Sequence, residues 1–301
     1  MTGLRSHVLL MFAALLLSAP LNAAPREYTF ERKFEKGDVL AVTEEQRTEC
    51  QYRSEWCGLQ GDPAATTAQT GKIIEVKCRE YDQETMEVDG KTVSFERIYR
   101  KATRENLSPG GKEIKKENTS MHGKTFKIKI SDDKFEQKCV NGVLMPDDAG
   151  DLKFSENLYA LLPEITVKEG ELWKVNEEKL GKGLFGPLYD PINFKASATG
   201  KVTGTTKHDG EECAKIAYVI EIRTEKSALV PGWKFNLQGE ALFAMEKGLL
   251  LQVALKGPVE MDKDDGKWVS LKAKGTTLYK YSAKLTRAEP PTTPPDEKGA
   301  K

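Results

Sequence analysis

Histidine is scarce in this sequence, although it is the side chain that most often acts as a catalytic base near neutral pH. Only His122 and His208 follow the N-terminal apolar run, and both lie at glycine turns. The sequence patterns of common hydrolases, zinc proteases, dinucleotide-binding domains and phosphate-binding loops do not occur. The 46 acidic residues are scattered, so no acid–base pair stands out. We therefore predict a protein that is not an enzyme and has no cofactor.

Charged segments give no sign of a metal site or of nucleic-acid binding. Residues 262–266 place aspartates before Gly266, as part of a calcium loop does, but no glutamate follows at the required spacing. A solvated hairpin turn is the better interpretation. The lysine runs at 112–116 and 124–129 include Ile or Phe, which is typical of the outer face of a strand. With 46 basic and 46 acidic residues, the chain has no general attraction to nucleic acid.

Five cysteines follow the apolar run, an odd number that leaves at least one thiol unpaired or paired between chains in an oxidising compartment. Cys50 and Cys57 are the candidate disulfide, because the short segment between them could fold back as a loop. Cys78 and Cys213 lie in predicted strands, where a role as small buried hydrophobic residues is the alternative. The cysteine spacing is not that of a zinc site.

Two tryptophans are candidate binding residues. Trp56 lies in the cysteine-bearing loop, and Trp233 directly follows the turn residues 231–232. An aromatic side chain at the exposed end of a sheet commonly contacts a ligand or a partner protein. Packing in the core is the alternative for both. Trp173 and Trp268 lie within strand patterns and are predicted to be core residues.

The N-terminal segment has the form of a secretory leader. Arg5 and His7 precede an apolar run at 8–17, which is too short for a bilayer that needs about 20 residues. We predict cleavage after Ala23, with an uncleaved anchor as the alternative. No cysteine follows the run, so a lipid anchor is not predicted, and no later apolar run is long enough to span a membrane. We expect the mature protein in the periplasm or outside the cell.

The mature chain alternates apolar and polar residues with a period of two between glycine turns, which predicts half-buried antiparallel strands. One segment, 151–162, instead repeats apolar residues at helical spacing from Phe154 until Pro163 ends the pattern. The proline-rich tail at 287–301 predicts disorder. The predicted strands are 28–34, 39–48, 72–81, 92–105, 124–130, 134–140, 194–202, 212–224, 234–246, 249–261 and 267–285.

An internal repeat is the most informative pattern. Residues 89–105 align without gaps on residues 209–225, and both begin with an Asp-Gly turn that leads into one long strand. The first half is longer, which places an insertion in the loop at 57–70, where function is often located. Chance similarity between two hairpin-rich halves is the alternative.

Three short segments carry a resemblance to known proteins: residues 168–173, with a glycine turn before Trp173, residues 209–216 and residues 239–243. In these segments the chain resembles a family of exported bacterial proteins of unknown function. The resemblance implies a signal peptide followed by a duplicated β-rich domain over most of residues 27–285. It implies no catalytic residues.

Together these patterns predict a mainly β protein with two similar antiparallel, half-barrel-like halves and a short linking helix. We expect it to bind an apolar small molecule or a cell-envelope protein in the concavity of its sheets. A structural or adhesion scaffold and a carboxylate-dependent hydrolase are the alternatives. The predicted divisions are a signal peptide (1–23), a first repeat (24–145) with an inserted loop at about 50–70, a helix with the second repeat (146–286) and the tail (287–301).

Overall fold

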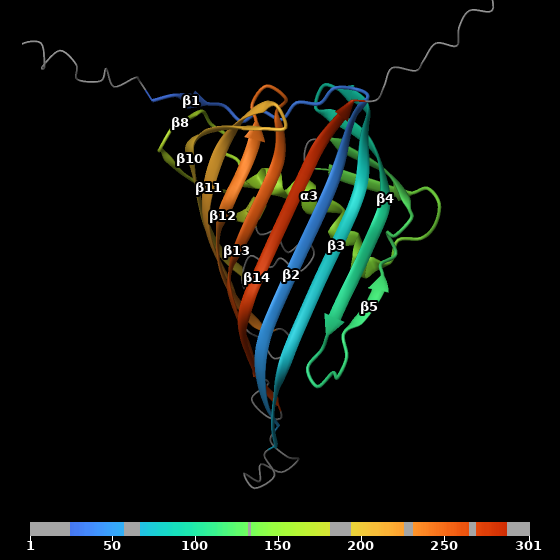
Figure 1. Ribbon diagram of the computed structural model, residues 1–301, viewed down its shortest axis with the longest axis vertical. Coiled ribbons are helices and arrows are strands. Elements are labelled where there is room, and N and C mark those ends of the chain that lie inside the picture. Colours follow the sequence, from blue (N-terminus) through green and yellow to red (C-terminus); the bar gives the residue numbers. More distant parts are fainter. Residues whose placement is uncertain are drawn as a thin grey trace, which may run out of the picture.

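The fold is dominated by one long, curved antiparallel sheet (Figure 1). The structure is a computed structural model that describes residues 25–56, 67–131, 134–180, 194–225, 231–264 and 269–287. Within these ranges, 12 strands form this sheet, in the order β7-β6-β4-β3-β2-β14-β13-β12-β11-β10-β9, with β5 paired to β4. Two further strands, β1 and β8, form a small sheet at one end. The prediction of a mainly β, antiparallel protein is therefore confirmed.

Several strands match the predicted lengths, but β2 and β3 are longer and extend into both ends of the predicted inserted loop at 50–70. The predicted strand at 28–34 is wrong, because only Glu27 and Tyr28 pair there, as β1. The predicted signal peptide, Cys57 and residues 288–301 of the predicted tail lie outside the described residues, whereas Arg287 ends β14. The strands are β1 (Glu27–Tyr28), β2 (Asp38–Trp56), β3 (Thr67–Asp89), β4 (Thr92–Leu107), β5 (Lys115–Asn118), β6 (Thr125–Ser131), β7 (Lys134–Cys139), β8 (Val167–Lys168), β9 (Leu172–Lys174), β10 (Phe194–His208), β11 (Glu211–Thr224), β12 (Gly232–Ala244), β13 (Leu249–Asp264) and β14 (Val269–Arg287).

The two predicted halves are joined into one sheet. The last strand, β14, pairs with β2 from Val269 opposite Trp56 to Arg287 opposite Asp38. Both strands are 19 residues long, so the pairing runs along their whole length. On either side of this pair the strands follow one another as antiparallel hairpins. The halves are therefore not two separate sheets, and the predicted duplication stays a prediction.

Three glycines on neighbouring strands lie where the backbones of adjacent strands approach closely. Gly239 on β12, Gly257 on β13 and Gly275 on β14 each face a backbone carbonyl so closely that a Cβ atom would lie 1.8 Å from its oxygen. Glycine is used in this way where a sheet must coil tightly, because no side chain has to be accommodated. We infer that the sheet bends at these glycines and that the bends help to curve it into a trough.

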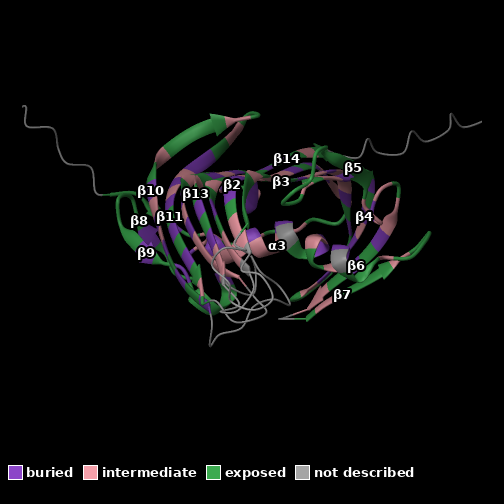
Figure 2. Ribbon diagram, turned by 90° about the horizontal axis from the view of Figure 1, so that it is seen from below, coloured by how far each residue is buried: buried purple, intermediate pink, exposed green. Residues whose placement is uncertain are grey.

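A helical segment lies in the concavity of this trough (Figure 2). It consists of four short pieces: α2 (Pro146–Ala149), η2 (Gly150–Lys153), α3 (Phe154–Leu158) and η3 (Tyr159–Leu161). The predicted helix at 151–162 is thus confirmed as a helical region, although it begins earlier and is broken into α and 3-10 turns. Leu152, Leu158 and Leu161 are buried against the sheet. None of the helices in the described ranges has the length and apolar character needed to span a membrane.

We expect Gly257→Ala to destabilise the fold because the new methyl group would collide with the carbonyl of Asn236. Overpacking of this kind costs about 1–3 kcal/mol, and a collision with backbone falls at the upper end. Gly150→Ala is the matched control, since Gly150 has helical dihedrals and open space at the Cβ position. Urea unfolding of both variants measures the difference. Equal stabilities would show that the bend at Gly257 does not constrain the sheet.

Candidate functional site

The inner face of the second part of the sheet is apolar. Side chains alternate between the two faces of a strand, and on β11 the inward positions Ile216, Ile220 and Ile222 are buried, whereas Val219 on the outside is 50% exposed. Their partners across β10 and β12 are apolar as well. We call this surface the apolar face. Its residues are Ala196, Ala198, Val202, Ile216, Ile220, Ile222, Phe235, Leu237, Ala241, Val253, Leu255 and Val259, all of them buried.

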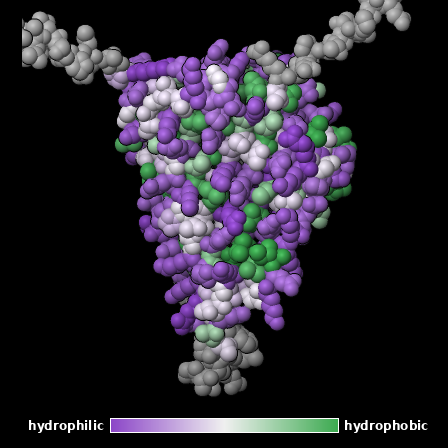
Figure 3. Space-filling view, viewed as in Figure 1, coloured by the Kyte–Doolittle hydropathy of each residue, from purple (hydrophilic) through white to green (hydrophobic). Residues whose placement is uncertain are grey.

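The outer face of the sheet differs sharply from this inner face. The space-filling view of the outer surface is mostly hydrophilic, with small apolar patches (Figure 3). Cross-strand ion pairs decorate it, such as Lys274 with Glu260 at 3.0 Å and Lys215 with Glu240 at 3.0 Å. Exposed pairs of this kind add little stability. The outer face is therefore the solvent-exposed side of the sheet.

The inner face of the first part of the sheet carries charges instead. Glu44 on β2 accepts hydrogen bonds from Arg79 and from the Tyr81 hydroxyl on β3, each at 2.7 Å. Arg79 also lies 3.0 Å from Asp151 of the helical segment. Both Glu44 and Arg79 are almost fully buried. A buried carboxylate and guanidinium are tolerated because they neutralise one another and are hydrogen-bonded.

Arg97 on β4 forms the second connection between sheet and helical segment. It donates to Gln83 on β3, to the Leu152 carbonyl at 2.7 Å and toward Glu156 at 3.3 Å. Glu156 is also paired with Arg32, whose guanidinium lies 3.9 Å from the centre of the Tyr159 ring. We use the name polar cluster for the charged residues Glu44, Arg79, Arg97, Asp151 and Glu156 together with Tyr81 and Tyr99, whose hydroxyls contact Glu44 and Arg97. It fixes where the helical segment lies on the sheet.

Electrostatics in the polar cluster favour the charged forms. Burial alone would raise the pKa of Glu156, but the charge and hydrogen bond of Arg32 and the charge of Arg97 outweigh it and hold that pKa below its usual value. Burial likewise would lower the pKa of Arg79, yet Glu44 and Asp151 raise it above the normal value. The partners of Glu156 and of Arg79 therefore favour the charged forms of these two side chains. This arrangement suits anchoring better than proton transfer.

The structure separates the two predicted binding tryptophans. Trp233 lies on the inner side of β12, half-buried, with its ring stacked 5.7 Å from that of Phe235. It contributes to the lining of a hollow of about 460 Å³ that also includes Lys234, Met261 and Lys274. Trp56 is the last residue of β2, which is separated from β12 by the two strands β14 and β13, and its side chain lies outside the described residues. Trp233 is thus placed beside a hollow, and the binding role of Trp56 stays a prediction.

The described cysteines are free thiols. Cys50 and Cys213 are buried, whereas Cys78 and Cys139 are half-buried. Burial raises the pKa of the Cys50 thiol, which disfavours the reactive thiolate. Its predicted partner Cys57 lies outside the described residues, so the Cys50–Cys57 bridge stays a prediction. Buried Cys213 behaves as the small hydrophobic residue that its strand position predicted.

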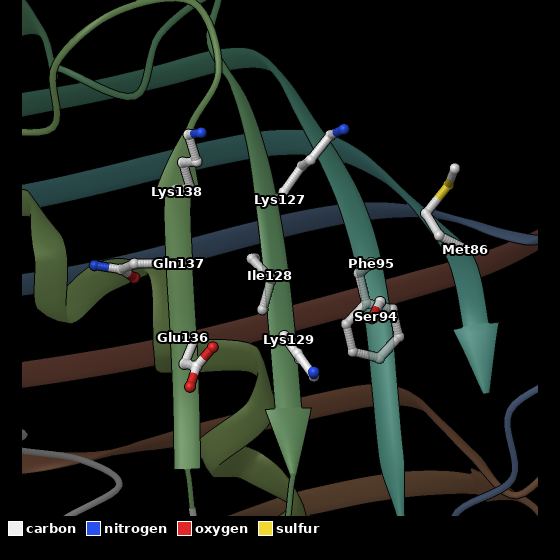
Figure 4. Close-up of a pocket in the computed structure, with 9 residues that line it drawn as sticks. All are labelled: Met86, Ser94, Phe95, Lys127, Ile128, Lys129, Glu136, Gln137 and Lys138. Carbon is white, nitrogen blue, oxygen red and sulfur yellow. The ribbon is translucent and has the colours of Figure 1, made fainter. Parts of the chain in front are cut away.

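A second hollow lies near the edge of the sheet, on β4, β6 and β7 (Figure 4). Its volume is about 380 Å³. Lys127 and Lys129 flank buried Ile128, as the alternating basic run predicted. The charged side chains that line this hollow are exposed to solvent, so the hollow does not shield a reacting group from water. The lining residues are Met86, Ser94, Phe95, Lys127, Ile128, Lys129, Glu136, Gln137 and Lys138.

The polar cluster was missed at the level of sequence, although a signal for it existed. In β4 the residues Phe95, Arg97 and Tyr99 occupy successive positions on one face, so an arginine between two aromatic residues points inward. In β2, Glu44 follows buried Leu40 and Val42 with the same period. A charge in phase with buried apolar residues predicts a buried ion pair, because an unpaired charge could not be buried.

Comparison with known protein families and with curated proteins gave no match. The resemblance to exported bacterial proteins of unknown function therefore stays a prediction. The functional interpretation rests on the inner face of the sheet, which is apolar on β10 to β13 and carries the polar cluster on β2 to β4.

We expect Glu156→Gln to destabilise the protein by about 3–5 kcal/mol, because it leaves the buried guanidinium of Arg97 without its opposite charge. Glu260→Gln is the control, since the Glu260–Lys274 pair is exposed. Urea unfolding at pH 7 compares the two variants. Similar values for both would mean that the polar cluster does not hold the helical segment.

The same glutamate should make stability depend on pH. Because the folded pKa of Glu156 lies below its usual value, its stabilising contribution is complete above about pH 4.3 and is lost as the pH falls through the folded pKa. Unfolding measured between pH 7 and pH 2 should therefore show a smaller acid loss in Glu156→Gln than in the wild type. Parallel profiles would contradict this assignment.

Proposed function

We propose that this chain is an exported, non-enzymatic binding protein that holds an apolar molecule on its apolar face. The observation that carries the proposal is the uncharged inner surface of β10 to β13, in a protein whose outer surface is strongly charged. Ligand sites are concave and lined mainly by apolar side chains, with a few polar groups. The secretory leader predicted for residues 1–23 supports the exported location.

The open form of the sheet supports entry of a ligand. The two ends of the strand order, β7 and β9, are not paired with each other in the described part of the chain. Among the described residues, no pairing between strands holds these two edges together, although a ligand would still have to displace the chain that buries the apolar face. Burial of apolar surface supplies about 25 cal/mol per Å², so a long apolar molecule would gain several kcal/mol on this face.

We also infer that the two parts of the sheet descend from a duplication whose copies have diverged on their inner faces. The Asp89-Gly90 turn joins β3 to β4, and the Asp209-Gly210 turn joins β10 to β11. Gly90 and Gly210 both have positive φ, of 56° and 88°. In this interpretation the first copy became charged to hold the helical segment, and the second stayed apolar to hold the ligand.

Native mass spectrometry of the mature protein, purified gently from a periplasmic extract, tests the proposal. We expect an excess mass that is released on denaturation and is identified as an apolar small molecule. A clean apo mass that does not change after incubation with a lipid extract would contradict the proposal and favour binding of a protein partner near Trp233.

A pair of variants locates the ligand. Ala198→Leu adds volume to the apolar face, whereas Ala217→Leu adds the same volume on the outer side of the neighbouring strand. We expect the inner variant to reduce the bound mass severalfold at unchanged secondary structure, and the outer one to retain it. Equal retention in both, with circular dichroism as the check on folding, would place the ligand elsewhere.

A further inference from the structure

Tyr218 is the one polar side chain in the middle of the apolar face among the described residues of β11. Its neighbours across the sheet are two glycines, Gly200 on β10 and Gly239 on β12. The residue is 2% exposed. Its hydroxyl has no hydrogen-bond partner in the described part of the chain.

The ring of Tyr218 is held in place from one side. Trp173 on β9 lies over Gly200, where a Cβ atom would come within 2.3 Å of the indole ring. The indole meets the Tyr218 ring edge to face, with 6.2 Å between centroids, and its Nε1 donates to the Leu161 carbonyl at 3.3 Å. Such aromatic packing over a glycine fixes orientation. These contacts therefore fix the orientation of the Tyr218 ring.

Three other tyrosines of the described residues, each buried or half-buried, have hydrogen-bond partners. The hydroxyl of Tyr81 donates to Glu44, that of Tyr159 accepts from the Leu250 amide, and that of Tyr52 accepts from the Gly110 amide. An unsatisfied buried hydroxyl costs about 1–3 kcal/mol, which phenylalanine would avoid at the same volume. Tyr218 thus carries a hydroxyl that costs stability and gives nothing to the fold.

The chemistry around Tyr218 selects the kind of group that it would bind. Burial raises the pKa of its phenol, so the group stays protonated and can donate a hydrogen bond. The surrounding residues Ile216, Ile220 and Leu237 are apolar and carry no charge. An ionised carboxylate or phosphate would be buried there without a cation, which is strongly unfavourable. An uncharged acceptor, such as an ester carbonyl, meets no such penalty.

We propose that the Tyr218 hydroxyl donates a hydrogen bond to the uncharged carbonyl of an acyl ester whose chain lies on the apolar face. This inference rests on the proposed function and names the ligand class of the same site. The fixed phenol would set the position of the ester along the trough, and the apolar face would take the chain.

A matched set of probes and variants tests this inference in the full-length mature protein. The assay measures how strongly each of three probes, methyl palmitate, an alkane of similar length and palmitate ion, competes with the dye N-phenylnaphthylamine for binding. It is carried out on the wild type, on Tyr218→Phe and on the control Tyr28→Phe. Tyr28 is buried too, but its hydroxyl donates to Glu169 away from the apolar face. Melting temperature checks the folding of each variant, and Tyr218→Phe should be no less stable than the wild type.

In the wild type, we expect the ester to bind about tenfold more tightly than the alkane, as one net hydrogen bond provides. Tyr218→Phe should lose that tenfold preference and keep its affinity for the alkane, whereas Tyr28→Phe should keep both. An unchanged preference in Tyr218→Phe, or tighter binding of palmitate ion than of the ester, would overturn the inference. Failure of every probe to bind the wild type would instead overturn the proposed function.

Discussion

The pairing of the first long strand with the last one is the constraint on which the rest of the structure depends. It joins β2 to β14 along all 19 residues of each strand. Without it the chain would form two separate sets of hairpins, each with long exposed edges that invite association with other chains. With it, the strands share one trough, and the bends at Gly257 and Gly275 lie on the two strands β13 and β14 that lead to the join.

A single trough also explains why the inner surface is divided. The helical segment is too short to cover 12 strands, and the polar cluster anchors it to β2, β3 and β4. A buried ion pair is often no more stabilising than apolar side chains of the same size. It does, however, destabilise any placement of the helical segment that leaves one of the two charges buried and unpaired. Arg97 and Arg79 thus specify where the helical segment lies on the sheet. In the part of the chain that the structure describes, no ion pair of the polar cluster involves the apolar face.

Local features of the fold could be predicted from the sequence, whereas the long-range ones could not. Period-two alternation and the turns at Gly90 and Gly210 predicted the hairpins, because both signals are short-range consequences of side-chain direction and positive φ. The contact between β2 and β14 leaves no local signal, since any two edge strands offer the same backbone groups. For the same reason, the sequence suggested two halves where the structure has one sheet.

The candidate site shows the same limit at the level of single residues. The alternation around Ile216 and Ile222 already predicts an apolar inner face, and the turn before Trp233 predicts that residue as a candidate for binding. The role inferred for Tyr218 depends on what its hydroxyl does not touch, and that is a property of three dimensions. A tyrosine in a strand usually finds a partner when it is buried. The hydroxyl of Tyr218, whose cross-strand neighbours are Gly200 and Gly239, has no hydrogen-bond partner in the described part of the chain. This absence favours a ligand contact over ordinary core packing.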